Sequence, residues 1–135
     1  MKEKVLRATT ENIEELLEFV AANLEPYSFE TKTRKQIYMA VEEIFVNISE
    51  YAYQDEEGEI VFQMDTADDP LTVMFRFTDE GIPFNPLQKE DPDIHKPLRE
   101  KKPGGLGIFI VKNTMDRTQY DYCDGKNILT FWKKL

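Results

Sequence analysis

Two polar side chains stand four residues apart in a stretch of the chain with helical periodicity. Glu43 and Asn47 therefore project from one side of a predicted helix, separated by a single turn. A carboxylate and an amide oxygen placed in this way can both reach a hydrated Mg²⁺, which prefers hard oxygen ligands and keeps several of its waters. The same pair is common on solvent-facing helices, so the spacing alone leaves both interpretations open.

A second candidate is the tripeptide Asp79-Glu80-Gly81, where a predicted strand ends. The carboxylate of Asp79 can accept a hydrogen bond from an exocyclic amine such as that of adenine, and Gly81 allows a flat ring to approach the backbone closely. The competing interpretation is a simple turn, because Asp and Gly are among the commonest turn residues. Considered alone, the tripeptide favours the turn.

The third candidate is the run Gly104-Gly105-Leu106-Gly107, which precedes a predicted helix that starts near Ile108. Glycines allow backbone N–H groups to converge, and the first-turn N–H groups of a helix point the same way, so the run can form an anion site. A hinge after a loop explains the run equally well. It is not a P-loop, because no Gly-Lys-Ser/Thr follows, and it is not a dinucleotide-binding turn, because no strand leads directly into it.

The elements that must position these candidates follow from hydrophobic periodicity, which predicts a strand, two helices, two strands, a long loop, a helix and two strands. This order predicts an α+β fold, a two-layer sandwich with helices on one face of a mixed, mostly antiparallel sheet. No repeat or linker divides the sequence, so residues 1–135 are expected to form one domain. The expected elements are an edge strand at 5–8, a helix ending before 26, a helix over about 31–53, strands at 60–64 and 71–78, a helix through 108–115, and a hairpin of 119–123 and 128–133.

Composition and charge narrow the possible classes of protein. The chain has 135 residues, of which 41% are hydrophobic and 32% are charged, as in ordinary globular domains. Its net charge of −9 argues against a nucleic-acid binder and requires that any bound anion be held by local groups. No apolar run approaches the roughly 20 residues that span a bilayer, and no signal-peptide core follows Met1. With the lone Cys123, expected to be a buried small hydrophobe, these features predict a cytoplasmic protein without a membrane or a disulfide.

The three candidates, taken in their order along the chain, are far more specific than any one of them. A helical Glu-x-x-x-Asn, a strand-ending Asp-x-Gly, a long loop and a Gly-Gly-x-Gly before a helix resemble the GHKL ATPase superfamily with its Bergerat fold, over nearly the whole chain. Within that superfamily the sequence is most similar to the stand-alone bacterial anti-sigma factor serine/threonine kinases. The segments that carry this likeness are 40–47, 50–53, 79–84, 104–116 and 125–130.

The resemblance implies ATP and Mg²⁺ as cofactors and a role for each candidate. Glu43 would be the general base that orients a protein serine hydroxyl, and Asn47 would coordinate Mg²⁺. Asp79 would bind the adenine amine, with Gly81 beneath the ring and Thr130 helping through its hydroxyl or a water. Residues 84–103 would form an ATP lid. The residues implied to hold the phosphates are Gly104, Gly105, Leu106, Gly107 and Ile108.

The resemblance also implies partners. The phosphoryl acceptor would be a serine on an anti-anti-sigma (STAS) protein, which competes with a sigma factor for the kinase, and the kinase itself would be a homodimer. Tyr51 and Pro83 depart from the family pattern, since many of these kinases have histidine and a second glycine there. Three alternatives remain: a nucleotide-dependent module that sequesters a partner with little kinase activity, a histidine kinase, and a small domain without a ligand. The only histidine, His95, lies in the expected lid, which disfavours the second.

Overall fold

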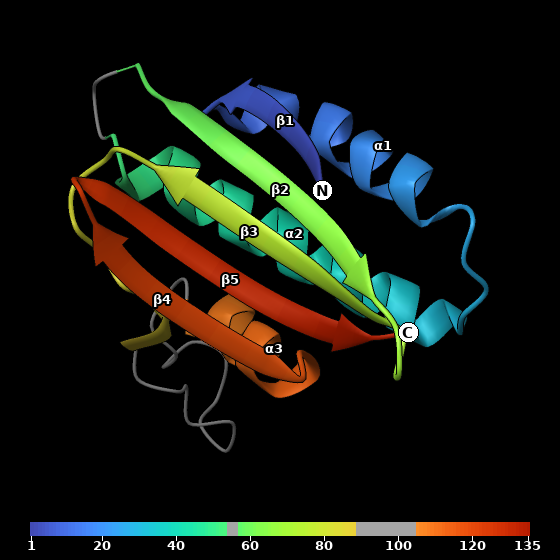
Figure 1. Cartoon of the computed structure of the whole chain (residues 1–135). Coiled ribbons are helices and arrows are strands. Elements are labelled where there is room, and N and C mark those ends of the chain that lie inside the picture. Colours follow the sequence, from blue (N-terminus) through green and yellow to red (C-terminus); the bar gives the residue numbers. More distant parts are fainter. Residues whose placement is uncertain (54–56, 89–104) are drawn as a thin grey trace.

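The computed structural model describes residues 1–53, 57–88 and 105–135, with backbone only for 105 and 106. Within these ranges the strands of a five-stranded sheet and three α-helices follow one another in the order that the periodicity predicts (Figure 1). The elements are β1 (Lys2–Arg7), α1 (Ile13–Leu24), α2 (Thr31–Tyr51), β2 (Glu59–Ala67), β3 (Thr72–Asp79), α3 (Gly105–Thr114), β4 (Arg117–Cys123) and β5 (Lys126–Lys134), with short 3₁₀ turns at Thr10–Asn12 and Pro86–Gln88.

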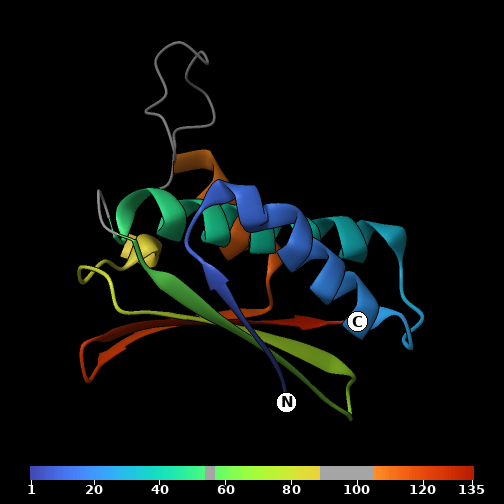
Figure 2. The same cartoon turned by 90° about the horizontal axis from the view of Figure 1, so that it is seen from above.

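The sheet has the strand order β1-β2-β3-β5-β4, and the three α-helices cover one of its faces (Figure 2). This arrangement confirms the α+β two-layer sandwich. Every neighbouring pair in the described sheet is antiparallel, so the sheet is not mixed. The reason lies in the last hairpin. Strands β3 and β4, which precede and follow α3 along the chain, run in the same direction. Strand β5 turns back and lies between them in the sheet, so it is antiparallel to both.

The core lies between the helices and the inward face of the sheet. Burial alternates along β3, where Val73, Phe75 and Phe77 are fully buried and their neighbours are not. Phe77 contacts Phe62 of β2 with ring centroids 4.9 Å apart, and Phe75 contacts Phe131 of β5 at 5.2 Å. Each buried phenylalanine contributes about 1.5–3 kcal/mol by leaving water, so these rings fix the pairing of the central strands.

Helix α2 crosses the middle of the sheet, and its C-terminal end is tied to the strands. It ends at Tyr51, two residues before the predicted end at Tyr53. The carbonyl oxygen of Ala52 accepts a hydrogen bond from the Ile82 N–H at 2.9 Å, and the Tyr53 hydroxyl donates to the Glu59 carbonyl at 2.6 Å. Residues 52 and 53 therefore take part in hydrogen bonds to the segment after β3 and to β2, and the helix does not continue through them. The buried residues of α2 are Ile37, Ala40, Val41, Ile44, Phe45 and Asn47.

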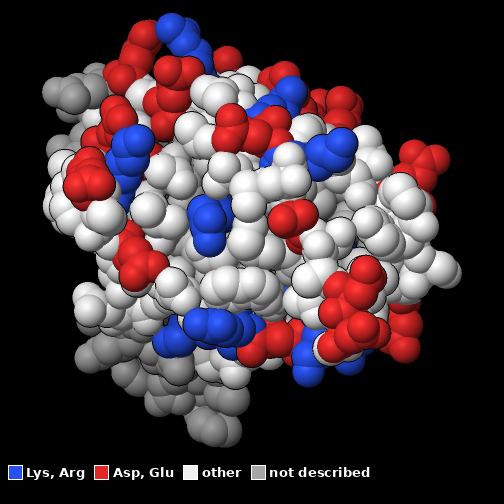
Figure 3. All heavy atoms as spheres, in the orientation of Figure 1, with Lys and Arg blue, Asp and Glu red and all other residues white. Residues whose placement is uncertain are grey.

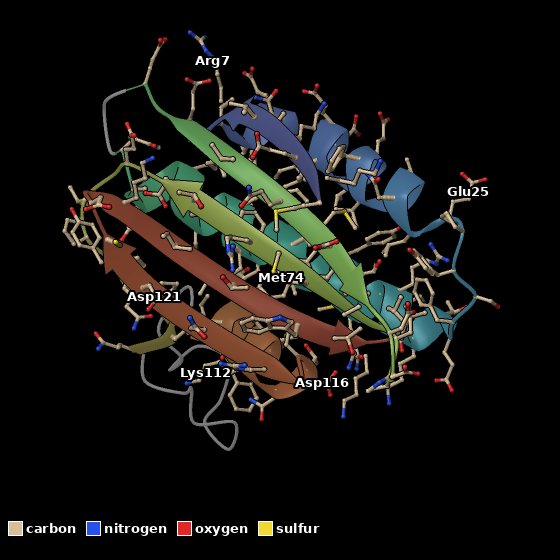
Figure 4. All side chains as sticks on the ribbon, viewed as in Figure 1. Arg7, Glu25, Met74, Lys112, Asp116 and Asp121 are labelled. Atoms are coloured by element: carbon tan, nitrogen blue, oxygen red, sulfur yellow. The ribbon has the colours of Figure 1, made fainter. Side chains whose placement is uncertain are left out.

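The outward face of the sheet carries no helix in the described part of the molecule. Met74 of β3 projects from this face (Figure 4), and acidic and basic side chains lie mainly around its margin (Figure 3).

Cys123 is exposed at the end of β4, so the expectation that it is buried was wrong: it directly precedes the tight turn at Asp124 and Gly125, where the edge strand leaves the sheet. Among the described helices, none has the length and apolar character that crossing a membrane requires.

Candidate nucleotide-binding site

The first part of the candidate site is a bonded pair of side chains on α2. Nδ2 of Asn47 donates a hydrogen bond to Oε1 of Glu43 at 2.8 Å and another to the Glu43 carbonyl oxygen at 2.9 Å. Asn47 is only 6% exposed, and Glu43 is half-buried. The four-residue spacing therefore brings the two groups together as expected. The contact orients the carboxylate of Glu43 toward the start of α3.

Helix α3 meets this pair through a glycine. A Cβ atom at Gly107 would overlap the carboxyl group of Glu43, so a side chain here would push that carboxylate out of its place beside the first turn of α3. The first-turn N–H groups of any helix have no partner within it, and α3 begins at Gly105, so N–H donors gather beside a carboxylate. An open groove of about 320 Å³ runs alongside. Its lining residues are Met39, Glu42, Glu43, Val46, Gly107 and Ile110.

The second part of the site lies where β3 ends. Asp79 is 4% exposed, and its Oδ1 accepts hydrogen bonds from the Gly81 N–H at 2.9 Å and from Nδ2 of Asn127 at 3.0 Å. Burial raises the pKa of the Asp79 carboxyl above its usual 3.8, while the two N–H donors oppose that rise. A buried carboxylate at a strand end with N–H donors around it is therefore a structured acceptor site, not a solvent-exposed turn.

Gly81 has a packing role that the sequence did not reveal. A Cβ atom at this position would overlap the carbonyl oxygen of Ala52, at the end of α2. The next residue, Ile82, donates its N–H to that same oxygen at 2.9 Å. The glycine thus lets the chain after Asp79 lie directly against α2. This close approach explains the glycine whether or not a ligand ring also lies beside it.

Asn127 of β5 completes this end of the site, and the sequence interpretation missed it. Its Nδ2 donates to Oδ1 of Asp79 and, at 2.9 Å, to the carbonyl oxygen of Ile82. Its Oδ1 accepts from the N–H of Phe84 at 3.1 Å and from the Tyr120 hydroxyl. The signal was present in the alternation of β5, because an asparagine at 127 shares the inward face with two core residues at 129 and 131.

Thr130 lies on the other face of the sheet. Residues opposite one another across β3 and β5 share a face, and Thr130 pairs with Arg76 while Asp79 pairs with Asn127. The Thr130 hydroxyl accepts a hydrogen bond from Nε of Arg76 at 3.1 Å. The structure therefore does not bring Thr130 together with Asp79.

A small cavity separates the Asp79–Asn127 contact from α2. Its volume is about 20 Å³, room for about one water molecule, whereas sites for drug-sized ligands have about 300–1,000 Å³. Ile82 and Phe84 are among the residues that line it, both partly exposed, and the Phe84 ring lies 6.2 Å from the ring of Tyr51. This cavity is too small for a nucleobase as it stands, and Asp79 also lines an open groove of about 620 Å³ on its other side.

The donor set fits Mg²⁺ bound together with phosphates. Within the described ranges, no cluster of three or more His, Cys, Asp or Glu side chains could hold a metal alone. Mg²⁺ in nucleotide sites commonly takes only one or two protein oxygens, with the rest from phosphates and water, and Glu43 and Asn47 suit that role. Of the expected lid, residues 84–88 include the turn at Pro86–Gln88, while 89–103, together with Gly104, lie outside the described residues.

Comparison with known proteins decides the family. A family model described as the histidine kinase-like ATPase domain matches residues 6–133, which is nearly the whole chain. The chain belongs to this family. Membership confirms the resemblance to GHKL ATPases and implies that this histidine kinase-like ATPase domain binds ATP.

The relatives of the chain include proteins named serine-protein kinase. The serine-protein kinase RsbW of Bacillus mycoides is 32% identical over 95 residues, and an RsbW of Bacillus cereus is 29% identical over 93 residues. Each alignment covers 67% of this ATPase domain and 58% of the relative, so the chain spans less than two thirds of their length. The histidine kinase AdeS of Acinetobacter baumannii has 16% identity and a TM-score of 0.48, with 99% of this chain and 68% of that one covered.

Proposed function

We propose that this ATPase domain is an anti-sigma regulatory factor that transfers the γ-phosphoryl group of ATP to a serine of an anti-anti-sigma (STAS) protein. One observation carries the proposal: the carboxylate of Glu43 is bonded to Asn47 and lies against the first turn of α3 at Gly107. A carboxylate held beside N–H donors can accept a hydroxyl proton next to a bound phosphate.

Each part of the site has a separate task in this proposal. Glu43 orients the serine hydroxyl and takes its proton while the hydroxyl oxygen bonds to the γ-phosphorus, the bond to the bridging oxygen breaks and ADP leaves. Asn47 contributes an oxygen to Mg²⁺, which when bound neutralises phosphate charge. Asp79 accepts the adenine amine. The backbone that opens α3 donates N–H groups to the phosphates. The chemistry needs positioning more than an activated nucleophile.

The relatives support the choice of acceptor and partners. Two serine-protein kinases named RsbW align with two thirds of this chain, and they motivate a protein serine as the acceptor. We extend the proposal to a sigma factor as the competing partner, a homodimer, a cytoplasmic location, and a single domain of residues 1–135 in which 84–103 act as the lid. The net charge of −9 suits a basic partner surface better than a nucleic acid.

The test is phosphoryl transfer that depends on Glu43. The protein is incubated with radiolabelled ATP, Mg²⁺ and the STAS protein encoded by a neighbouring gene, and label on the STAS protein is counted. We expect transfer with the native chain and none above background with Glu43→Ala. Glu18→Gln is the matched control, since it removes an exposed carboxylate from α1, on the other side of α2 from α3 (Figure 1). Transfer that survives Glu43→Ala would reject the kinase proposal.

The small cavity beside Asp79 favours one alternative. A domain whose base cavity must open at each nucleotide exchange is suited to holding a partner while nucleotide stays bound, with little turnover. For such a sequestering module, Glu43→Ala would leave partner binding intact while Asn47→Ala would abolish it. Co-purification of the sigma factor with each variant, with and without ATP, separates the two functions.

A further inference from the structure

Lys133 is a charged residue on the inward face of β5, the face that borders the core. Residues 127, 129, 131 and 133 share this face, and Leu129 and Phe131 are buried. Lys133 is half-buried and lies opposite the fully buried Val73 in the pairing of β3 with β5. A lysine in this place must direct its ammonium group to a partner, because burying a charge without one is costly.

The partner of Lys133 is the C-terminal end of α3. Its Nζ donates a hydrogen bond to the carbonyl oxygen of Thr114 at 2.6 Å. Thr114 is the last residue of α3, and the last four carbonyl groups of a helix have no partner within it. The helix dipole also favours a cation here, since the C-terminus of a helix carries a partial negative charge. Lys133 therefore caps α3 from another element of the fold.

Two further hydrogen bonds hold the same end of α3 against β5. The N–H of Asp116 donates to the carbonyl oxygen of Trp132 at 2.9 Å, and the N–H of Lys134 donates to Oδ2 of Asp116 at 2.7 Å. Together with the bond from Lys133, these contacts connect the helix end to three consecutive residues of one strand. Strand β5 is a firm support, because its buried phenylalanine packs against that of β3.

Apolar packing alone defines the position of α3 less closely than these bonds do. The buried residues Ile108, Val111 and Met115 follow one another at helical spacing and belong to the core. Apolar contacts are non-directional, whereas a hydrogen bond weakens steeply when its distance or angle changes. The bond from Lys133 therefore limits how far α3 can shift along its axis or turn about it.

The other end of α3 is the one that the proposed function assigns to the phosphates. It begins at Gly105, and its first turn lies beside the carboxylate of Glu43 at Gly107. The 10 residues of the helix span about 15 Å. A helix of this length moves as a stiff rod, so a displacement at Thr114 is passed on to the N–H groups of the first turn.

We propose that Lys133 is a positioning residue for α3: by capping the C-terminus of the helix on β5, it holds the first-turn N–H groups where the phosphates of ATP bind. This inference rests on the proposed nucleotide binding and adds to it a residue at the far end of the helix from the nucleotide. The two ends of α3 are then matched, with a cation at the negative end and an anionic ligand at the positive end. The effect of Lys133 reaches the phosphates and not the base, since Asp79 lies on β3.

The experiment compares a ligand that carries phosphates with one that does not. ATP with Mg²⁺ is titrated by calorimetry, and adenosine, which has the same base and no phosphates, is titrated by NMR. We expect Lys133→Met to bind ATP about 3- to 10-fold more weakly and to bind adenosine with native affinity. Lys133→Arg keeps a cationic donor and should restore ATP affinity to within about 2-fold of native.

Lys134→Met is the matched control. It removes the same charge from the next residue, which is exposed, and it leaves the backbone bond from Lys134 to Asp116 in place. We expect this variant to bind both ligands as the native chain does. Circular dichroism checks that each variant folds.

Four results would overturn the inference. The first two are native ATP affinity in folded Lys133→Met and an equal loss in Lys134→Met, which would assign the effect to net charge. The others are equal weakening of ATP and adenosine, which would indicate a general loosening of the domain, and a Lys133→Arg variant as weak as Lys133→Met. A native chain that fails to bind ATP would instead reject the proposed function, and this inference with it.

A measurement on the native chain covers the case in which Lys133→Met does not fold or adenosine binds too weakly to measure. Coupling between two sites is reciprocal, so bound phosphates must in turn strengthen the bond from Lys133 to Thr114. In ¹⁵N spectra of lysine side chains, the ammonium protons of Lys133 should exchange with water more slowly after saturation with ATP, while those of Lys134 should not change. Exchange at Lys133 that ATP leaves unaltered would contradict the coupling.

Discussion

The two ends of the candidate site are built in opposite ways. At the β3–β5 end, the buried side chains of Asp79 and Asn127 bond each other, and Tyr120 of β4 bonds Asn127, around a cavity of about 20 Å³. At the α2–α3 end, formed by Glu43, Asn47 and Gly107, one bonded pair borders an open groove of about 320 Å³. The first end is closed and hydrogen-bonded in advance, while the second is open to a reacting group.

This difference indicates how the work of the site is divided. A closed, buried end can discriminate between ligands, because a mismatched group there leaves polar atoms unpaired. An open end beside a carboxylate can admit a second protein, but it discriminates little. We therefore expect changes at the β3–β5 end to alter affinity for nucleotide and changes at the α2–α3 end to alter the rate of transfer.

The largest expected effect is on that rate. Glu43→Gln keeps the oxygen that accepts from Asn47 but removes the carboxylate that takes a proton. We expect phosphoryl transfer to fall about 10²- to 10⁴-fold with ATP affinity little changed. Single-turnover assays with labelled ATP, paired with calorimetry on the same preparation, check both values. A parallel loss of affinity would break the division between the two ends.

The next effect is on affinity. Asp79→Ala removes the acceptor for the adenine amine, and a hydrogen bond to a charged group is worth about 1.5–3 kcal/mol. We expect ATP to bind about 10- to 100-fold more weakly, with the transfer rate at saturating ATP close to native. Glu18→Gln, remote from the site, should match the native Kd. If Asp79→Ala slowed the saturated rate as strongly as Glu43→Gln, the two ends would not act separately.

A smaller effect concerns the contact between the helices. Gly107→Ala places a methyl group where the Glu43 carboxyl lies, so that side chain must rotate away and lose its hydrogen bond to Asn47, a loss of about 0.5–1.5 kcal/mol in the free energy of unfolding. Urea denaturation measures the change, and Asn113→Ala on an exposed position of α3 is the matched control. In the double variant Glu43→Ala/Gly107→Ala the cost should largely disappear. A cost unchanged by removal of the carboxyl would show that another contact is responsible.

The smallest expected effect depends on pH. The pKa of Asp79 is raised by burial, so the folded state binds its proton more tightly than the unfolded state does. The contribution of Asp79 to stability is then fully present below the usual 3.8 and is lost as pH rises through the folded pKa. Asp79→Asn removes this titration, so its Tm relative to the native chain should rise as pH increases across that window. A constant difference from acid to neutral pH would contradict the raised pKa.

Much of this site could be predicted from the sequence because it depends on local spacing. The helical period places Glu43 over Asn47, and a strand followed by Asp-x-Gly marks the acceptor at 79. The register between β3 and β5 is not local, and it alone pairs Asp79 with Asn127. Strand parity could have separated Asn127 from Thr130, since residues 127, 129 and 131 share one face. The volume of the cavity depends on how Ile82 and Phe84 pack, which no spacing encodes.

Helix α2 also sets the distance between the two ends of the candidate site. This helix carries Asn47 of the α2–α3 end and, at its C-terminus, Ala52, which bonds the segment after Asp79. The two residues lie about 7.5 Å apart along the helix axis. Loops can lengthen or shorten at little cost, but one residue inserted between these positions would turn the later one by about 100° and shift it by about 1.5 Å. The two ends would then face different directions. Substitutions can retune either end alone, while the distance between them changes only when the helix is rebuilt.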